Sequence, residues 1–139
     1  MSQDEEDVEF LGAAKNQVLR YLDHSDVKYR AVAEQPDWYL APYISIWPVF
    51  GQHAQKPGWF AIAGDVPTDY VSSDDANDAR SAMRHFSRLW LEAAACMAEG
   101  KAHPSFKIGK PEDWPSLYPM LKQRGELLAE FAEDKSLWD

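Results

Sequence analysis

Residues 38–50 read WYLAPYISIWPVF, and residues 58–66 read GWFAIAGDV. Both runs are rich in β-branched and aromatic residues and are bounded by Gly or Pro, so they predict two strands, at 39–50 and 58–66. A polar loop at 51–57 separates them, which predicts an antiparallel hairpin. Pro42 and Pro48 have no N–H to donate, so we expect the first strand to lie at an edge or to be interrupted.

Helices are predicted on both sides of this hairpin. Apolar residues recur at three- to four-residue spacing in two long segments, and weaker patterns suggest two shorter helices. The four predicted helices are 4–22, 25–33, 74–99 and one from Pro119 to about 135, with a short further strand at Tyr70-Val71. An isolated hairpin is marginal in water. We therefore expect one α+β domain over 1–139, mainly helical, with three to five helices packed on a central two- or three-stranded antiparallel β-hairpin.

The charge balance restricts the classes of partner. The chain has 14 Lys and Arg against 23 Asp and Glu, a net charge of −9. An acidic protein repels phosphate backbones and anionic lipids, so we expect neither nucleic acid nor membrane as a partner. Solubility explains such a charge most simply. A basic protein partner, as for an immunity protein, and mimicry of nucleic acid are sharper alternatives.

The compartment is predicted from cysteine usage and from the first residues. Cys96 is the single cysteine, so the chain forms no internal disulfide. Residues 1–7 are acidic and have no apolar segment of the kind found in secretory signals. No apolar run approaches the length of a membrane span. We expect a cytoplasmic protein.

The segment after the second strand is the first candidate site. Residues 64–70 read GDVPTDY, and this segment carries Asp65, Thr68, Asp69 and Tyr70. Two nearby carboxylates suit acid–base or metal chemistry. Asp and Thr equally satisfy backbone donors in turns, so a purely structural turn is the alternative.

A row of arginines on the predicted long helix is the second candidate. Arg80, Arg84 and Arg88 follow i, i+4, i+8 spacing, which places three guanidinium groups on one face. They can clamp a carboxylate or phosphate. Alternatively they pair with the protein's own acids, either Glu92 in the same row or the aspartates of residues 64–70. His85 lies one position away and can serve as a general base or as a plain surface residue.

No other residues form a pattern typical of catalysis. His24, His53 and His103 are scattered in predicted loops without metal-ligand spacing, and Cys96 lies beside an apolar stripe, as a buried inert thiol does. Gly-rich phosphate loops and nucleophile motifs are lacking in the sequence. We therefore predict no catalytic residue, no metal and no cofactor.

The aromatic residues of the hairpin predict an interface. If the first strand is unbroken, Tyr39, Tyr43 and Trp47 share one face, and Trp38 and Phe50 share the other. Large rings on both faces require a cover on each, from helices or from a second copy of the chain. The predicted interface residues are Tyr43, Trp47 and Trp59.

Three segments also carry a resemblance to a known family. The stretch from Trp38 to Tyr43, the pair Gly58-Trp59 and the run GDVPTDY at 64–70 are similar to a family of uncharacterised bacterial proteins of about this length, known only as a domain of unknown function. The likeness covers most of the chain, and the last run is its most specific part. Because the family has no established activity, the resemblance transfers no catalytic residue. It implies an uncharacterised bacterial protein, with a cytoplasmic location.

Three functions follow as hypotheses. The first is a non-catalytic interaction protein that forms a homodimer through its aromatic hairpin. The second is a small enzyme or ligand-binding protein in which Asp65 and Asp69 lie against the long helix that carries Arg84, His85 and Arg88. The third is an acidic immunity-like partner of a basic protein, which makes an unknown protein the expected ligand.

Overall fold

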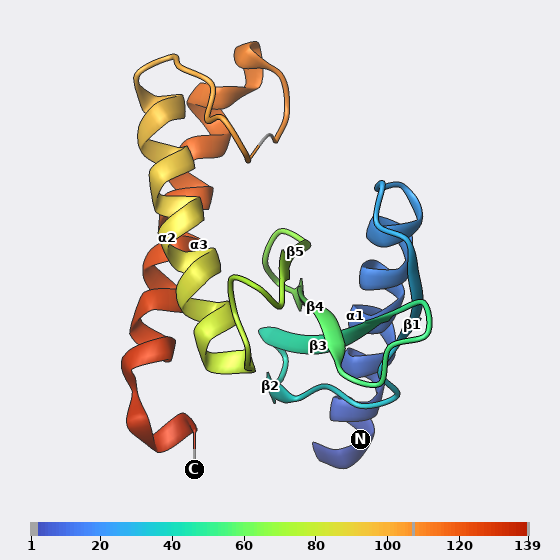
Figure 1. Cartoon of the computed structure of the whole chain (residues 1–139). Coiled ribbons are helices and arrows are strands. Elements are labelled where there is room, and N and C mark those ends of the chain that lie inside the picture. Colours follow the sequence, from blue (N-terminus) through green and yellow to red (C-terminus); the bar gives the residue numbers. More distant parts are fainter. Residues whose placement is uncertain (1–2, 107, 139) are drawn as a thin grey trace. The chain divides into compact units, whose positions relative to one another are not determined.

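The computed structural model describes residues 3–106 and 108–138. The chain forms two compact units, Met1–Ala79 and Arg80–Asp139 (Figure 1). The expected single domain over 1–139 stays a prediction.

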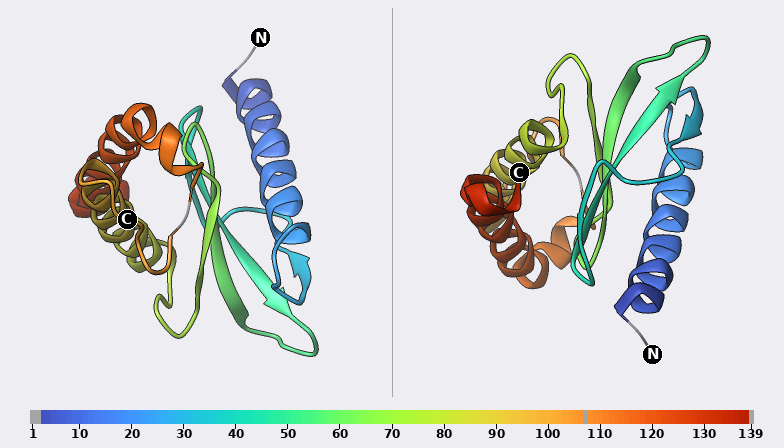
Figure 2. Two further views of the ribbon diagram at one scale, coloured as in Figure 1. Left: turned by 90° about the horizontal axis from the view of Figure 1, so that it is seen from above. Right: turned by 90° about the horizontal axis from the view of Figure 1, so that it is seen from below.

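The first unit is a helix on an antiparallel sheet. Helix α1 is Gln3–Asp23, and the strands are β1 Tyr29–Val32, β2 Trp38–Leu40, β3 Ile44–Gly51, β4 Pro57–Gly64 and β5 Asp69–Ser72. The strand order is β1-β3-β4-β5, and β2 also pairs with β3. Helix α1 lies along one face of this sheet, in contact with β4, β1 and β3 (Figure 2).

This architecture is α+β, as expected, but it corrects the predicted arrangement of helices and strands. The described residues hold three α-helices and a five-stranded antiparallel sheet, so the expected helical assembly on a two- or three-stranded hairpin is wrong. The helix predicted at 25–33 is also wrong, because Tyr29–Val32 forms strand β1. So short a segment gains little from helical hydrogen bonds alone, whereas pairing with β3 satisfies its backbone and buries Val32.

The interruption expected at Pro42 is present. The strand predicted at 39–50 divides there into β2 and β3, with a cis Ala41-Pro42 peptide between them. The Tyr43 N–H donates to the Leu40 carbonyl at 2.8 Å, and Leu40 then pairs with Ile44. The chain therefore folds back on itself within four residues, and the parity expected for an unbroken strand does not extend across Pro42.

Pro48 lies inside the central strand β3, a position where proline normally removes a ladder hydrogen bond. Its carbonyl accepts from the Ala33 N–H at 2.9 Å, so the proline nitrogen faces the same side. On that side β1 has just ended at Val32 and β2 does not begin until Trp38. The missing donor therefore falls in the gap between two short strands.

The core of the first unit lies between α1 and the sheet. Ala14, Val18 and Leu22 recur at helical spacing on α1 and are fully buried. They pack with Val32, Trp47, Val49, Ala61 and Ala63 from the strands. The Trp47 indole N–H donates to Ser45 Oγ at 2.7 Å, and that hydroxyl donates to the Ala63 carbonyl at 3.0 Å. The polar atoms of this core are thus hydrogen-bonded, as burial requires.

The second unit is a pair of antiparallel helices (Figure 1). Helix α2 is Ala79–Ala98 and α3 is Trp114–Glu133, with short 3-10 turns η1 at Pro111–Asp113 and η2 at Lys135–Leu137. Helix α2 begins later than the predicted residue 74, because residues 72–76 form a turn closed by bonds from Asp75 and Ala76 to the Ser72 carbonyl. Helix α3 begins earlier than predicted, since Pro115 occupies its first turn, where a missing donor costs little. No helix in the described part of the chain is long and apolar enough to cross a membrane.

Candidate functional site

The predicted site residues are divided between the two units. Asp65, Thr68, Asp69 and Tyr70 belong to the first unit, and Arg80, Arg84, His85 and Arg88 belong to the second. Each group has a definite geometry within its own unit. A ligand site that combines the two groups stays a prediction.

The turn from β4 to β5 places its two aspartates in different environments. Asp65 is exposed, and its N–H donates to the Tyr43 carbonyl at 2.8 Å. Asp69 is buried in β5, where its carboxylate accepts from the Tyr70 N–H at 2.8 Å. No group of three or more His, Cys, Asp or Glu side chains among the described residues is arranged to hold a metal ion. Thr68, which lies between the two aspartates in the sequence, is half-buried.

Tyr70 turns toward helix α1 rather than toward the solvent side of this turn. Its ring contacts the ring of Tyr21 edge to face, with the centroids 5.9 Å apart. Partial burial, the Asp69 carboxylate and Tyr70 together raise the pKa of Tyr21 to about 12. Tyr70 therefore belongs to the packing between α1 and β5.

A hollow of about 260 Å³ lies beside the predicted turn, between α1 and the end of β4. Its lining residues are Phe10, Ala13, Ala14, Gln17, Pro42, Gly64 and Asp65. The Gly64 N–H donates to Gln17 Oε1 at 3.0 Å, which fixes the amide and leaves its NH₂ end as a donor. Gly64 has φ of 137°, and a Cβ there would collide with the Tyr43 backbone, so only glycine suits this position.

Two exposed tyrosines lie close to residues that line this hollow, in the chain or through a hydrogen bond. Tyr43 is 51% exposed, and its backbone bonds to Asp65. Tyr39 is 41% exposed, and its hydroxyl donates to Asp7 Oδ2 at 3.2 Å, which raises the pKa of Tyr39. Asp7 lies one turn before Phe10 on α1. We call this region the acidic aromatic surface; it comprises Asp7, Phe10, Gln17, Tyr39, Pro42, Tyr43 and Asp65.

The arginine row mainly binds the C-terminal end of α3. Arg80 Nε donates to the Ala132 carbonyl at 2.7 Å, and its guanidinium lies 5.9 Å from the centre of the Trp138 ring. Arg84 forms an exposed ion pair with Glu133 at 2.8 Å and lowers the pKa of that carboxyl. A helix C-terminus attracts cations because its last carbonyls have no helical partner. These bonds favour the structural interpretation of the row, with α3 as the partner in place of Glu92.

Arg88 and Glu92, the last residues of the row, lie beside histidines instead. Arg88 Nη2 lies 3.5 Å from His85 Nδ1, both on the exposed or half-exposed side of α2. Glu92 instead lies 3.5 Å from the Nε2 atom of His103.

His103 is a buried polar residue that the sequence patterns did not single out. Its Nδ1 accepts from the backbone N–H groups of Ser105 and Phe106, at 3.1 and 3.0 Å. Since Nδ1 accepts, the neutral ring carries its proton on Nε2, where it faces Glu92. Both nitrogens are thus engaged within the protein, which suits a loop-closing role and leaves no nitrogen for proton abstraction from a substrate. The His–Pro pair at 103–104 is its only sequence signal.

The three predicted interface residues differ in exposure. Trp47 is 1% exposed and belongs to the core below α1, so it cannot lie at the centre of a surface interface. Trp59 is half-buried and packs against the same core. Tyr43 alone of the three is exposed. Cys96, expected to be buried, is half-buried on α2.

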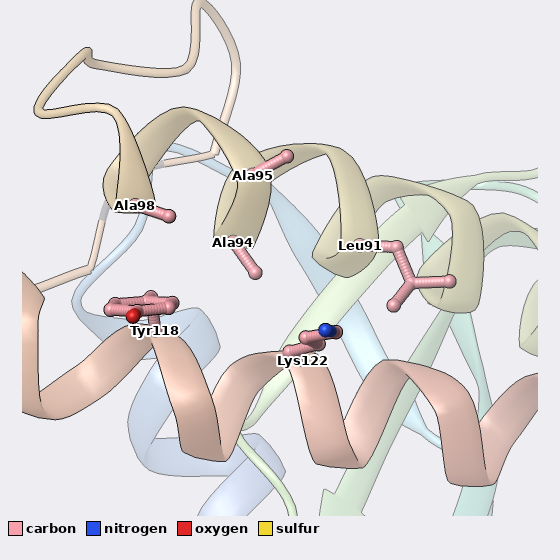
Figure 3. A pocket seen from close by; sticks show the side chains of 6 residues that line it. All are labelled: Leu91, Ala94, Ala95, Ala98, Tyr118 and Lys122. Carbon is pink, nitrogen blue, oxygen red and sulfur yellow. The ribbon is translucent and has the colours of Figure 1, made fainter.

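A second hollow, of about 200 Å³, lies between the two helices of the second unit (Figure 3). We call it the alanine groove; its lining residues are Leu91, Ala94, Ala95 and Ala98 of α2 and Tyr118 and Lys122 of α3. The Tyr118 ring lies below Ala94 and Ala98, and the Lys122 side chain rises between the helices (Figure 3).

Comparison with known proteins gives a family and no activity. The model of the family described as domain of unknown function (DUF4826) matches residues 6–138. No curated protein and no solved structure matches the chain. The chain therefore belongs to this family, as its resemblance predicted.

Proposed function

We propose that this family member is a non-catalytic interaction protein whose acidic aromatic surface binds a basic segment of a partner protein. The observation that carries the proposal is the hollow between α1 and the end of β4. Its lining combines apolar residues, among them Phe10 and Pro42, with an acidic one, Asp65.

The apolar part of the surface suits a protein ligand. Tyr39 and Tyr43 keep 41% and 51% of their surface in contact with solvent although each is part of, or adjacent to, the sheet. Tyrosine is enriched at the energetic centres of protein interfaces, because its ring buries area and its hydroxyl stays hydrogen-bonded. The hollow beside them can accept one side chain of a partner.

The charge of the surface selects a basic partner. The residues that line the hollow include no Lys or Arg, while Asp65 and Asp7 contribute carboxylates. The first turn of α1 adds Asp4, Glu5 and Glu6. A Lys or Arg side chain can place its aliphatic stem on Phe10 and its charge beside Asp65. The net charge of −9 adds long-range attraction for such a partner.

A second copy of the chain fits this surface less well. In a two-fold dimer the same patch meets itself, so carboxylates would approach carboxylates. Of the three residues predicted at a homodimer interface, Trp47 lies in the core. Light scattering at micromolar concentration distinguishes the cases, and we expect a monomer in the absence of a basic partner.

Titration calorimetry with a Lys- and Arg-rich peptide, and with its Glu-substituted counterpart, tests the proposal. We expect saturable binding of the basic peptide alone, weakened by salt. Asp65→Asn and Phe10→Ala should each weaken it roughly tenfold, which corresponds to about 1.4 kcal/mol. Asp26→Asn, an exposed acid beyond the other end of α1, is the matched control and should leave binding unchanged. Equal binding by all variants, or no binding of the basic peptide, would overturn the proposal.

A further inference from the structure

We propose that the alanine groove of the second unit binds a small carboxylate that carries one ring or a short aliphatic chain. This site is independent of the acidic aromatic surface, because all of its lining residues lie on α2 and α3.

The hollow exists because α2 presents small side chains where α3 presents long ones. Near its middle, α3 approaches closely, since Gly125 has no side chain to hold Leu91 away. Ala94, Ala95 and Ala98 continue α2 beyond that point and carry only a methyl group each. Ala94 is buried at the floor, whereas Ala95 and Ala98 are exposed at the rim. The space above the floor is therefore open to solvent and bordered by carbon.

The volume restricts the ligand to a small one. A buried apolar cavity of about 150 Å³ admits benzene. The alanine groove holds about 200 Å³, enough for one ring or a chain of similar size, and is open on one side, where a polar group can remain hydrated. The Tyr118 ring provides a flat wall for the apolar part of such a ligand (Figure 3).

The polar groups of the groove select an anion. Lys122 and Tyr118 supply the side-chain polar groups of its lining. The Lys122 ammonium only donates hydrogen bonds, whereas the Tyr118 hydroxyl can donate or accept, so the preference for an anion comes from Lys122. The lining includes no carboxylate, although the chain has 23 acidic residues. Glu126 lies one turn further along α3, and no ion pair joins it to Lys122 in the described part of the chain. A carboxylate beside Lys122 gains a charge-assisted bond, whereas an ammonium group would be repelled.

Titration of the isotope-labelled full chain with hexanoate, followed by backbone amide shifts, tests the site. We expect saturable shifts at Ala94, Ala95 and Ala98. Hexylamine and hexanol have the same chain length and should bind at least about tenfold more weakly, because each lacks the charge-assisted bond to Lys122.

Two variants locate the binding. Lys122→Gln should weaken hexanoate binding about tenfold, and Lys135→Gln, an exposed lysine of η2, should leave it unchanged. Ala98→Leu should fill the groove and abolish binding, and leucine at an exposed helix position preserves the fold, which circular dichroism checks. Equal binding of hexylamine, wild-type affinity in Lys122→Gln, or no saturable shift at the three alanines would overturn the proposal.

Discussion

Gly125 of α3 packs directly against Leu91 of α2. A Cβ atom built on the glycine would lie 2.9 Å from the leucine Cγ, closer than side chains tolerate. Beside this contact, the Ser87 hydroxyl donates to the Gly125 carbonyl at 2.9 Å. The glycine therefore sets how closely the two helices of the second unit approach each other.

Gly125→Ala should lower the free energy of unfolding, although alanine is the better helix former. The added methyl group must displace Leu91 or separate the helices, and such overpacking costs roughly 1–3 kcal/mol. Urea unfolding followed by circular dichroism measures the change. A double variant with Leu91→Ala should recover part of it, because the colliding side chain is then removed.

Gly12→Ala is the matched control. Gly12 is exposed on α1, and nothing lies within 4 Å of a Cβ placed there. Alanine should therefore stabilise α1 by up to about 1 kcal/mol. If Gly125→Ala is as stabilising as Gly12→Ala, the close approach at Leu91 is refuted.

Trp47→Ala should destabilise the first unit by roughly 3–5 kcal/mol, because it removes a fully buried ring. Tyr43→Ala removes a ring that is 51% exposed and should change stability by less than about 1 kcal/mol. Denaturant midpoints of the two variants give the comparison. Similar midpoints would contradict the assignment of Trp47 to the core and Tyr43 to the surface.

His103→Leu should loosen the loop after α2, because the Ser105 and Phe106 N–H groups lose their acceptor. A hydrogen bond contributes about 1 kcal/mol net, so hydrogen exchange of these two amides should become roughly fivefold faster. His103→Asn keeps an acceptor near the position of Nδ1 and should retain most of the protection. Unchanged exchange in His103→Leu would show that the ring does not close this loop.

Alkaline pH should destabilise the first unit through Tyr21. Its pKa is about 12 in the folded protein, against an ordinary value of 10.0. Between these values the unfolded chain loses the proton first, so the folded state binds more protons and stability falls as pH rises from about 10 to about 12. Tyr21→Phe removes this contribution, and its denaturant midpoint should fall less than that of the wild type over the same range. An identical fall in both proteins would contradict the raised pKa.

The long periodic segments and the aromatic runs were sufficient to predict α1, most of α2 and the β3–β4 hairpin. Strand β1 was not predicted, because Tyr29–Val32 takes its conformation from pairing with β3 rather than from local preference. Most of β2 lay within the strand predicted at 39–50, but its separation from β3 and its pairing with that strand were not predicted. Trp47 was misassigned for a related reason. The alternation of side chains along a strand placed Trp47 on one face. The sequence alone did not show that α1 covers that face.

The residues of the arginine row could be predicted from the sequence, but the groups that they bind could not. The row of Arg80 and Arg84 was evident from helical spacing, yet the carbonyl of Ala132 and the carboxylate of Glu133 lie about fifty positions away and have no sequence link to it. The sequence contains even less indication of the alanine groove. Three alanines on a helix are common, and they enclose space only because Tyr118 and Lys122 stand opposite.

Opposite Pro48, one edge of the sheet is made of two short strands, β1 and β2, with a gap between them. This arrangement also affects aggregation. The outer margin there consists of β1 and β2, four and three residues long, with a bulge inside β1, and the opposite margin is the four-residue β5. An incoming chain meets only a few consecutive N–H and C=O groups on either margin of the described sheet. Aromatic-rich β segments tend to aggregate by pairing strands between chains. The short edge strands of the first unit therefore oppose such aggregation.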